Sequence, residues 1–165
     1  MSLTDTLNTM VATVTGEVLN RYRLDIPSCT AVIDVEDFSG SEAMSELYSY
    51  TIHFTSAHKK IDARQMLSKP ATLTMGAGNL LSLTERKVVH GVVIRFERTG
   101  GSADEAKYCI VLEPFLALLR NQFRTHRFFV NKSVPEVVAE VLTEHGLKDW
   151  EYEFTLKEDY PKREQ

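Results

Sequence analysis

Hydrophobic and polar positions alternate along much of the chain. The alternation is strictest over residues 48–55, where Tyr, Tyr, Ile and Phe occupy the even positions and Ser, Thr and His the odd ones. A period of two is typical of a strand with one buried and one polar face. Weaker alternation covers residues 21–26, 31–35, 71–75, 86–98 and 108–112. Short strands separated by turn residues predict an antiparallel barrel or sandwich.

Two glycines bear on how these strands are connected and shaped. Residues 39–42 read as turn formers that join the flanking strands into a hairpin, and Gly40 is expected to be free to take a positive φ there. Gly91 lies inside a predicted strand, which indicates a β-bulge or a close approach of another backbone. In that strand the alternation places Val88, His90 and Val92 on one face.

The clearest helix signal covers residues 133–145. Ser133 and Glu136 form a capping box, an apolar stripe follows, and Gly146 suits the position that ends a helix. Residues 61–67 and 115–119 predict short helical turns, the second plugging one end of the barrel. Residues 122–130 and 150–154 read as further strands, and residues 99–104 as an exposed loop.

Residues 1–20 read as an N-terminal extension with an apolar stripe at helical spacing, although their threonines are poor helix formers. The stripe suits docking on a partner as well as packing on its own domain. Residues 21–165 are predicted to form one mainly β domain of the β-rich α+β class. It is an antiparallel β-barrel with the single C-terminal capped helix packed against one end.

Composition narrows the range of partners. The chain has 165 residues and a net charge of −4, too mild to favour a nucleic acid or an anionic membrane as partner. No apolar stretch approaches the roughly 20 residues of a membrane-spanning helix. No secretory signal is recognisable, so synthesis in the cytoplasm is expected. Cys29 and Cys109 are interpreted as reduced core residues, with a disulfide as the alternative.

Candidate catalytic residues do not form a recognisable motif. The five histidines lack the spacing of zinc ligands and are interpreted as surface residues, except His90, which is interpreted as a satisfied core residue. Asp34, Glu36 and Asp37 could mimic paired carboxylates, but a solvated strand edge is the simpler explanation and the one that we favour. We therefore predict no catalytic residues, no metal, no cofactor and no enzyme activity. A small thiol enzyme and a freestanding adaptor module remain alternatives.

Several short motifs occur along the chain in an order that is similar to the order in one protein family. Their residues are Phe38, Gly40, Glu42, Ser45, Leu47, Tyr48 and Tyr50, then His90 and Gly91, then Pro114 in Leu-x-Pro-Phe-Leu, then Arg127 and Phe129, and finally Tyr160, Pro161, Arg163 and Glu164. In this order they resemble the VgrG spike proteins of type VI secretion systems, which are related to baseplate hub proteins of contractile phage tails. One departure is Phe115, which stands where the family usually has Trp.

The resemblance implies a structural role for the N-terminal hub region of a spike. Such a protein forms a homotrimer, sits on the secretion tube and baseplate, and helps deliver effectors by puncturing target membranes. The membrane is contacted only through a β-helical needle that these residues do not include, and no nucleic acid is involved. The spike is translocated out of the cell. The chain is expected to stop before the rest of the hub and to be monomeric or weakly oligomeric. A phage or prophage tail hub is the nearest alternative.

Overall fold

The computed structural model describes residues 21–76, 86–120, 126–148 and 151–164. The chain divides into two compact units, Met1–Ala117 and Leu118–Gln165, which are described separately below. The prediction for residues 1–20 lies outside the described residues. None of the described helices is long and apolar enough to cross a membrane.

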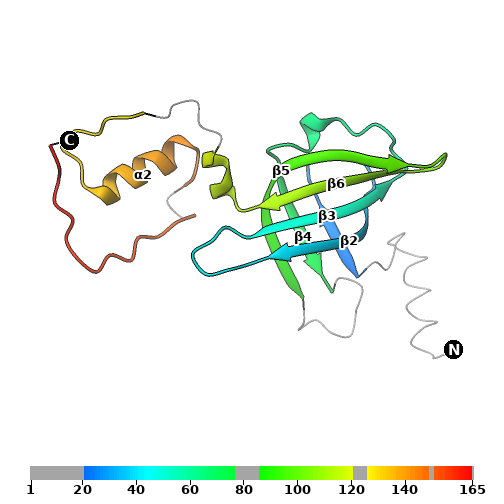
Figure 1. The fold of residues 1–165 in the computed structure, drawn as a ribbon, viewed down its shortest axis with the longest axis horizontal. Coiled ribbons are helices and arrows are strands. Elements are labelled where there is room, and N and C mark those ends of the chain that lie inside the picture. The colour runs from blue at the N-terminus through cyan, green and yellow to red at the C-terminus, as the bar shows by residue number, and fades with distance from the viewer. Residues whose placement is uncertain (1–20, 77–85, 121–125, 149–150, 165) are drawn as a thin grey trace. The chain divides into compact units, whose positions relative to one another are not determined.

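The first unit is a curled antiparallel sheet (Figure 1). Its strands follow the order β1-β4-β5-β6-β3-β2, and all neighbours are antiparallel. The strands are β1 (Tyr22–Asp25), β2 (Asp34–Ser41), β3 (Ser49–Ser56), β4 (Pro70–Met75), β5 (Lys87–Gly101) and β6 (Ala106–Glu113). A short 3-10 helix, η1 (Ala63–Gln65), precedes β4. The predicted antiparallel barrel is confirmed as a nearly closed one.

An aromatic contact bridges the seam of the barrel. The edge strands β1 and β2 do not share a ladder, but the rings of Tyr22 and Phe38 meet edge to face with centroids 5.0 Å apart. Phe38 also lies 6.1 Å from the ring of Tyr50. Packing these partly buried rings against each other joins the two edges and helps to protect edges that would otherwise be open.

The barrel core confirms the buried face that the alternation over residues 48–55 predicted. Ile52 and Phe54 on β3 are fully buried, and the Tyr108 ring stacks between those of Phe54 and Phe96 at 5.3 and 5.5 Å. Leu73, Val93, Ile110 and Leu112 complete the fully buried aliphatic layer. These residues come from β3, β4, β5 and β6, so the sheet closes around one core.

The predicted face of β5 is wrong for its first half. Val88 is 45% exposed and His90 is exposed, whereas Val89 is buried. A bulge between Val93 and Arg95 explains the error, because one extra residue moves the following side chains to the opposite face. A single alternation therefore cannot describe the whole strand. The interpretation of His90 as a satisfied core residue is therefore wrong, because this residue is exposed.

The predicted turn around Gly40 is also wrong. β2 continues to Ser41, and Gly40 pairs with Tyr50 inside the ladder, although the hairpin itself is confirmed. The left-handed backbone falls instead at Ser45, with a φ of 63°. At the other hairpin the exposed loop is shorter than predicted, because β5 extends to Gly101 before β6 starts at Ala106.

The second unit contains α2 (Val134–Glu144), and the 3-10 helix η2 (Phe115–Arg120) lies across the boundary between the units. The helix predicted over 133–145, with its capping box of Ser133 and Glu136, and the helical turn predicted at 115–119 are confirmed. That this turn plugs one end of the barrel stays a prediction. The predicted strands at 122–130 and 150–154 are wrong where they are described, because residues 126–130 and 151–154 join no ladder. The alternation in these segments favours extended backbone. An extended segment becomes a β-strand only when a neighbouring segment forms hydrogen bonds with it. The packing of α2 against the barrel stays a prediction.

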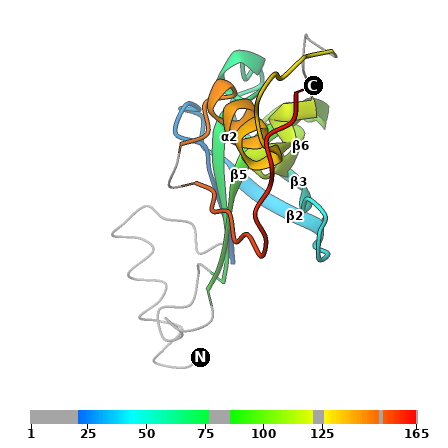
Figure 2. The same ribbon diagram turned by 90° about the vertical axis from the view of Figure 1, so that its left-hand side faces the viewer.

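Residues after α2 return past the helix (Figure 2). Near the end of this return, Arg163 pairs with Lys132 in an isolated antiparallel bridge just before α2 begins. The second unit thus brings together segments that are far apart in the sequence, around a helix of which only Leu142 is buried.

Candidate functional site

The first two motifs meet on the barrel. The Tyr48 hydroxyl, at the start of β3, donates a hydrogen bond to the carbonyl oxygen of His90 on β5. A Cβ at Gly91 would lie 2.4 Å from the carbonyl oxygen of Glu113 and 3.1 Å from the Tyr48 hydroxyl. Only glycine leaves room for this approach, so the predicted close backbone contact is confirmed. Glu113 directly precedes the motif residue Pro114, which is half-buried.

Gly40 fulfils a similar steric requirement beneath Tyr50. A Cβ at Gly40 would lie 2.3 Å from the Tyr50 ring. The ring is thereby seated so that its hydroxyl donates to Glu42 Oε1 over 2.5 Å. The same oxygen accepts from Lys87 Nζ at 2.8 Å, and that ammonium lies 5.8 Å from the centroid of the Tyr50 ring. We call Glu42, Tyr50 and Lys87 the loop clamp, because they hold the β2–β3 loop to the start of β5.

The loop clamp shifts the acid–base properties of its members. The hydrogen bond from Lys87, and after it the one from Tyr50, lowers the pKa of the Glu42 carboxyl. The same bond to Glu42 raises the pKa of Lys87. Lys87 was not identified from the sequence, since it lies 45 residues from Glu42 and belongs to no motif.

The remaining residues of the first motif shape the β2–β3 loop and its base. Phe38 packs against the core, Leu47 is half-buried, and Ser45 adopts the left-handed backbone. Beside Ser45 the side chain of Met44 is 96% exposed. The motif therefore builds a fixed base and a loop that presents an apolar side chain to solvent.

The later motifs meet in the second unit. Arg127 forms a two-pronged ion pair with Glu144 of α2, in which one of the contacts measures 2.6 Å. This pairing raises the pKa of Arg127. The guanidinium also lies 5.0 Å from the centre of the Phe129 ring, and Lys132, paired with Glu140, lies 5.9 Å from the same ring. Two cations thus flank Phe129 and are neutralised by α2.

The final motif reaches this cluster through its main chain. The Arg163 N–H donates to the Lys132 carbonyl at 3.1 Å, and the Asn131 N–H donates to the Arg163 carbonyl at 2.9 Å. The other members, Tyr160, Pro161 and Glu164, are exposed.

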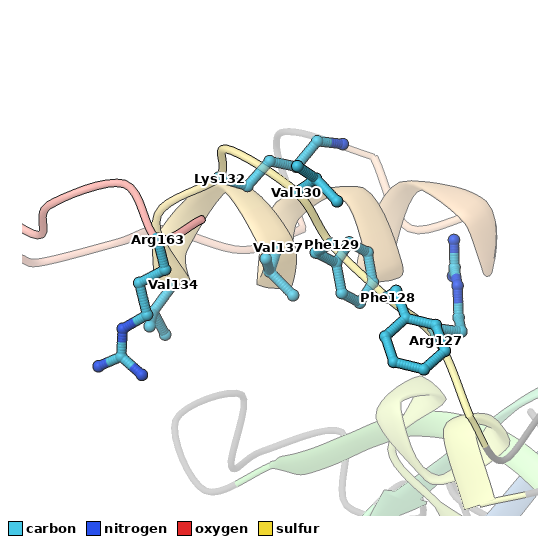
Figure 3. A pocket seen from close by; sticks show the side chains of 8 residues that line it. All are labelled: Arg127, Phe128, Phe129, Val130, Lys132, Val134, Val137 and Arg163. Carbon is cyan, nitrogen blue, oxygen red and sulfur yellow. The ribbon is translucent and has the colours of Figure 1, made fainter. Parts of the chain in front are cut away.

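A groove of about 520 Å³ opens in this unit (Figure 3). The residues that line it are Arg127, Phe128, Phe129, Val130, Lys132, Val134, Val137 and Arg163. It is mostly apolar with cationic residues at its margin, a combination suited to holding a polypeptide segment.

The residues that could support catalysis are held in ion pairs or are partly or fully buried. Asp37 meets His53 at 2.7 Å, and Glu36 meets Lys107 at 2.6 Å, so these members of the acidic cluster are in ion pairs. Both cysteines are free, and burial raises the pKa of the Cys109 thiol, which disfavours the reactive thiolate. In the described part of the chain, no three His, Cys, Asp or Glu side chains are grouped as metal ligands.

A nearly closed antiparallel barrel followed by a capped-helix unit defines a protein of the phage tail hub class. The family model for the phage tail baseplate hub (GPD) matches residues 41–165, and the chain belongs to that family.

Comparison with solved structures supports the same family. The fold matches a structure of the E. coli c3393 protein with a TM-score of 0.73 and 33% identity, over 86% of this chain and 37% of that one. That structure is described as a component of the type VI secretion system similar to the T4 bacteriophage tail proteins gp27 and gp5. The predicted resemblance to type VI spike and phage hub proteins is confirmed.

Curated relatives are spike proteins. The type VI secretion system spike protein VgrG1a of Pseudomonas aeruginosa is 30% identical over 129 residues, which cover 78% of this chain and 19% of the relative. VgrG2a of the same organism is 33% identical over 72% of this chain and 13% of the relative. The actin cross-linking toxin VgrG1 of Vibrio cholerae is 30% identical over 79% of this chain and 12% of the relative. The chain spans at most 19% of the length of these relatives.

Proposed function

We propose that this chain is a structural part of the hub of a type VI secretion spike, with residues 21–165 as one hub region behind the extension at 1–20. The observation that carries the proposal is the match to the E. coli secretion component at 33% identity and a TM-score of 0.73. The phage tail hub family supports the same architectural role.

In this proposal the motif residues act as structural parts rather than as catalysts. Tyr48, Gly91 and the loop clamp fix the β2–β3 hairpin on the barrel. The ion pairs of Arg127 and Lys132 fix the segment before α2. Each of these contacts joins two elements, which a load-carrying module requires. In this proposal the chain itself contributes no catalytic residues.

The assembly that we propose is a homotrimer seated on the secretion tube and the baseplate. The protein is made in the cytoplasm and leaves the cell as part of the spike, and membrane contact is confined to a needle outside these residues. No described helix suits a membrane span, which is compatible with a part that does not itself enter the bilayer.

Deletion of the gene in its own bacterium tests this role. We expect the tube protein to disappear from the culture medium and to return when the intact gene is supplied. A matched complementation with Gly91→Ala, which disturbs the barrel, is expected to restore less secretion than Gly100→Ala, whose added methyl has open space. Unchanged secretion after deletion would contradict the proposal.

A phage or prophage tail hub is the second candidate, and the family description favours it specifically. The two candidate functions share a fold, but deletion of the gene would abolish a different process in each case. If the tail-hub reading is correct, the deletion abolishes tail particles after prophage induction and leaves tube secretion intact.

A further inference from the structure

The β2–β3 loop carries an exposed apolar side chain on an anchored turn. The Glu46 N–H closes this turn by donating to the Ala43 carbonyl at 3.3 Å, and Ser45 supplies the left-handed backbone with a φ of 63°. Between them the Met44 side chain is 96% exposed. The loop clamp ties Glu42, just before the turn, to β5. The methionine is therefore held on a fixed base while its own side chain stays in water.

The same turn presents a negative charge. Glu46 is exposed, and within the described residues its carboxylate makes no hydrogen bond or ion pair. The carboxylate of Glu42, by contrast, is held by the loop clamp. The tip of the loop thus combines one apolar side chain with one carboxylate that is free to pair.

The groove of the second unit has the complementary properties (Figure 3). Its apolar lining includes Phe128 and Val130, which are 95% and 66% exposed. Of the cations at its margin, Arg127 and Lys132 are already paired with carboxylates of α2. Arg163 is exposed, and its guanidinium has no partner among the described residues. It lies at the end of the groove near the start of α2.

We propose that this groove receives the tip of the β2–β3 loop of a second copy of the chain. Met44 would cover part of the apolar lining, and the Glu46 carboxylate would pair with the Arg163 guanidinium. Charge complementarity selects this occupant, because each surface leaves one apolar group exposed and one charge of opposite sign unpaired. The groove, at about 520 Å³, has the size of a typical ligand site and so has room for the loop tip.

The contact joins two different patches, so it is of the head-to-tail kind. Such contacts close into a ring when the rotation between copies allows it. One methionine and one exposed ion pair make a weak contact, so the chain is expected to be a monomer when dilute. Closure into the homotrimer rests on the proposed function, whereas the contact between two copies does not.

An NMR titration between two forms of the intact chain separates a contact between copies from a contact within one copy. The 15N-labelled form carries Met44→Ser, which disables its own loop and leaves its groove intact. Unlabelled wild type is then added. We expect the amides of Phe129 and Val130 to shift progressively as the wild-type concentration rises.

Unlabelled variants identify the groups that make the contact. Glu46→Lys is expected to bind the labelled form about fivefold or more weakly than wild type, because an ion pair becomes a repulsion. Met44→Ser is expected to bind about tenfold or more weakly, since it removes a buried apolar side chain. Asp104→Lys is the matched control. It makes the same change of charge at an exposed position in the other hairpin loop and should bind as wild type does.

A charge exchange tests the role assigned to Arg163. A second labelled form combines Met44→Ser with Arg163→Glu. This form should bind unlabelled Glu46→Lys more tightly than it binds wild type, which reverses the order found with the first labelled form. A purely structural role of Arg163 would leave the order unchanged. The amides of α2 report whether the unit remains folded.

Three results would overturn the proposal. One is that wild type leaves the groove amides of the first labelled form unshifted. Another is that Glu46→Lys and Asp104→Lys bind equally well, or that Arg163→Glu fails to reverse the order. The last is that dilute wild type and the dilute Met44→Ser form already differ at the groove amides, which would mean that each chain places its loop in its own groove. None of these results depends on secretion, so the gene deletion tests the proposed function separately.

Discussion

Individual glycines and polar side chains set the geometry of the barrel. Gly91 is required by the carbonyl of Glu113 and Gly40 by the ring of Tyr50, so both are dictated by tertiary packing rather than by turns. The sequence identified both positions as special. It misjudged Gly40, because nothing local shows that Tyr50 lies across the ladder.

Gly91→Ala tests the steric requirement. The new methyl would meet the Glu113 backbone at 2.4 Å, so we expect a loss of about 1–3 kcal/mol in the free energy of unfolding, the usual range for overpacking. Gly100→Ala on the same strand is the matched control, since its methyl finds nothing within 4 Å. Urea unfolding followed by circular dichroism measures both, and equal losses would contradict this explanation.

The loop clamp makes a pH-dependent contribution to stability. Because the pKa of Glu42 is lower in the folded state, the stabilisation is present above the unfolded-state pKa and is lost as the pH falls through the folded one. We therefore expect wild type to exceed Glu42→Gln in melting temperature at neutral pH, by a margin that shrinks in acid. Salt should reduce the margin as well, since the pair is exposed. A margin independent of pH would show that the charge of Glu42 does not contribute.

Strands and helices could be predicted where the residues that specify them lie close together in the sequence. The β3 alternation and the α2 capping box depend on residues a few positions apart, and both predictions are confirmed. The face of β5 was not predictable, because the bulge after Val93 shows only in the pairing with β6. The strand predicted over 122–130 failed where it is described, because alternation cannot reveal the absence of a neighbour. Lys87 was missed for a related reason, since its partner Glu42 is distant in sequence.

Ser133→Ala tests the start of α2. It removes the hydroxyl that accepts from the Glu136 N–H, so we expect the helix to lose about 0.5–2 kcal/mol, as is usual for a lost N-cap. Faster amide exchange in the first turn of α2 is the measurement. Thr143→Ala, an exposed substitution on the same helix, should leave these amides unchanged. Equal exchange in the two variants would mean that other contacts determine where the helix begins.

At the scale of the whole molecule, a nearly closed barrel precedes a helical unit in which few of the described apolar residues are buried. Such an arrangement suits a part that is completed by neighbouring pieces of an assembly. The sequence motifs predicted the family, which the comparisons confirm. They did not predict that the motif residues would gather as two clusters, one in each unit.

We expect the isolated chain to be a monomer or a weak oligomer, as the sequence resemblance implies for a hub region taken by itself. Size-exclusion chromatography with light scattering should give a mass near 18.7 kDa at low concentration. A tight trimer would contradict this expectation and place the trimer contacts within the barrel or the helical unit.

Cryo-electron microscopy of the assembly purified from the native bacterium through a tag on this protein tests the central claim most directly. The account predicts three copies of the barrel arranged around the axis of a spike, seated at the end of a secretion tube. Particles in which the barrel lies apart from any tube or tail axis would contradict it.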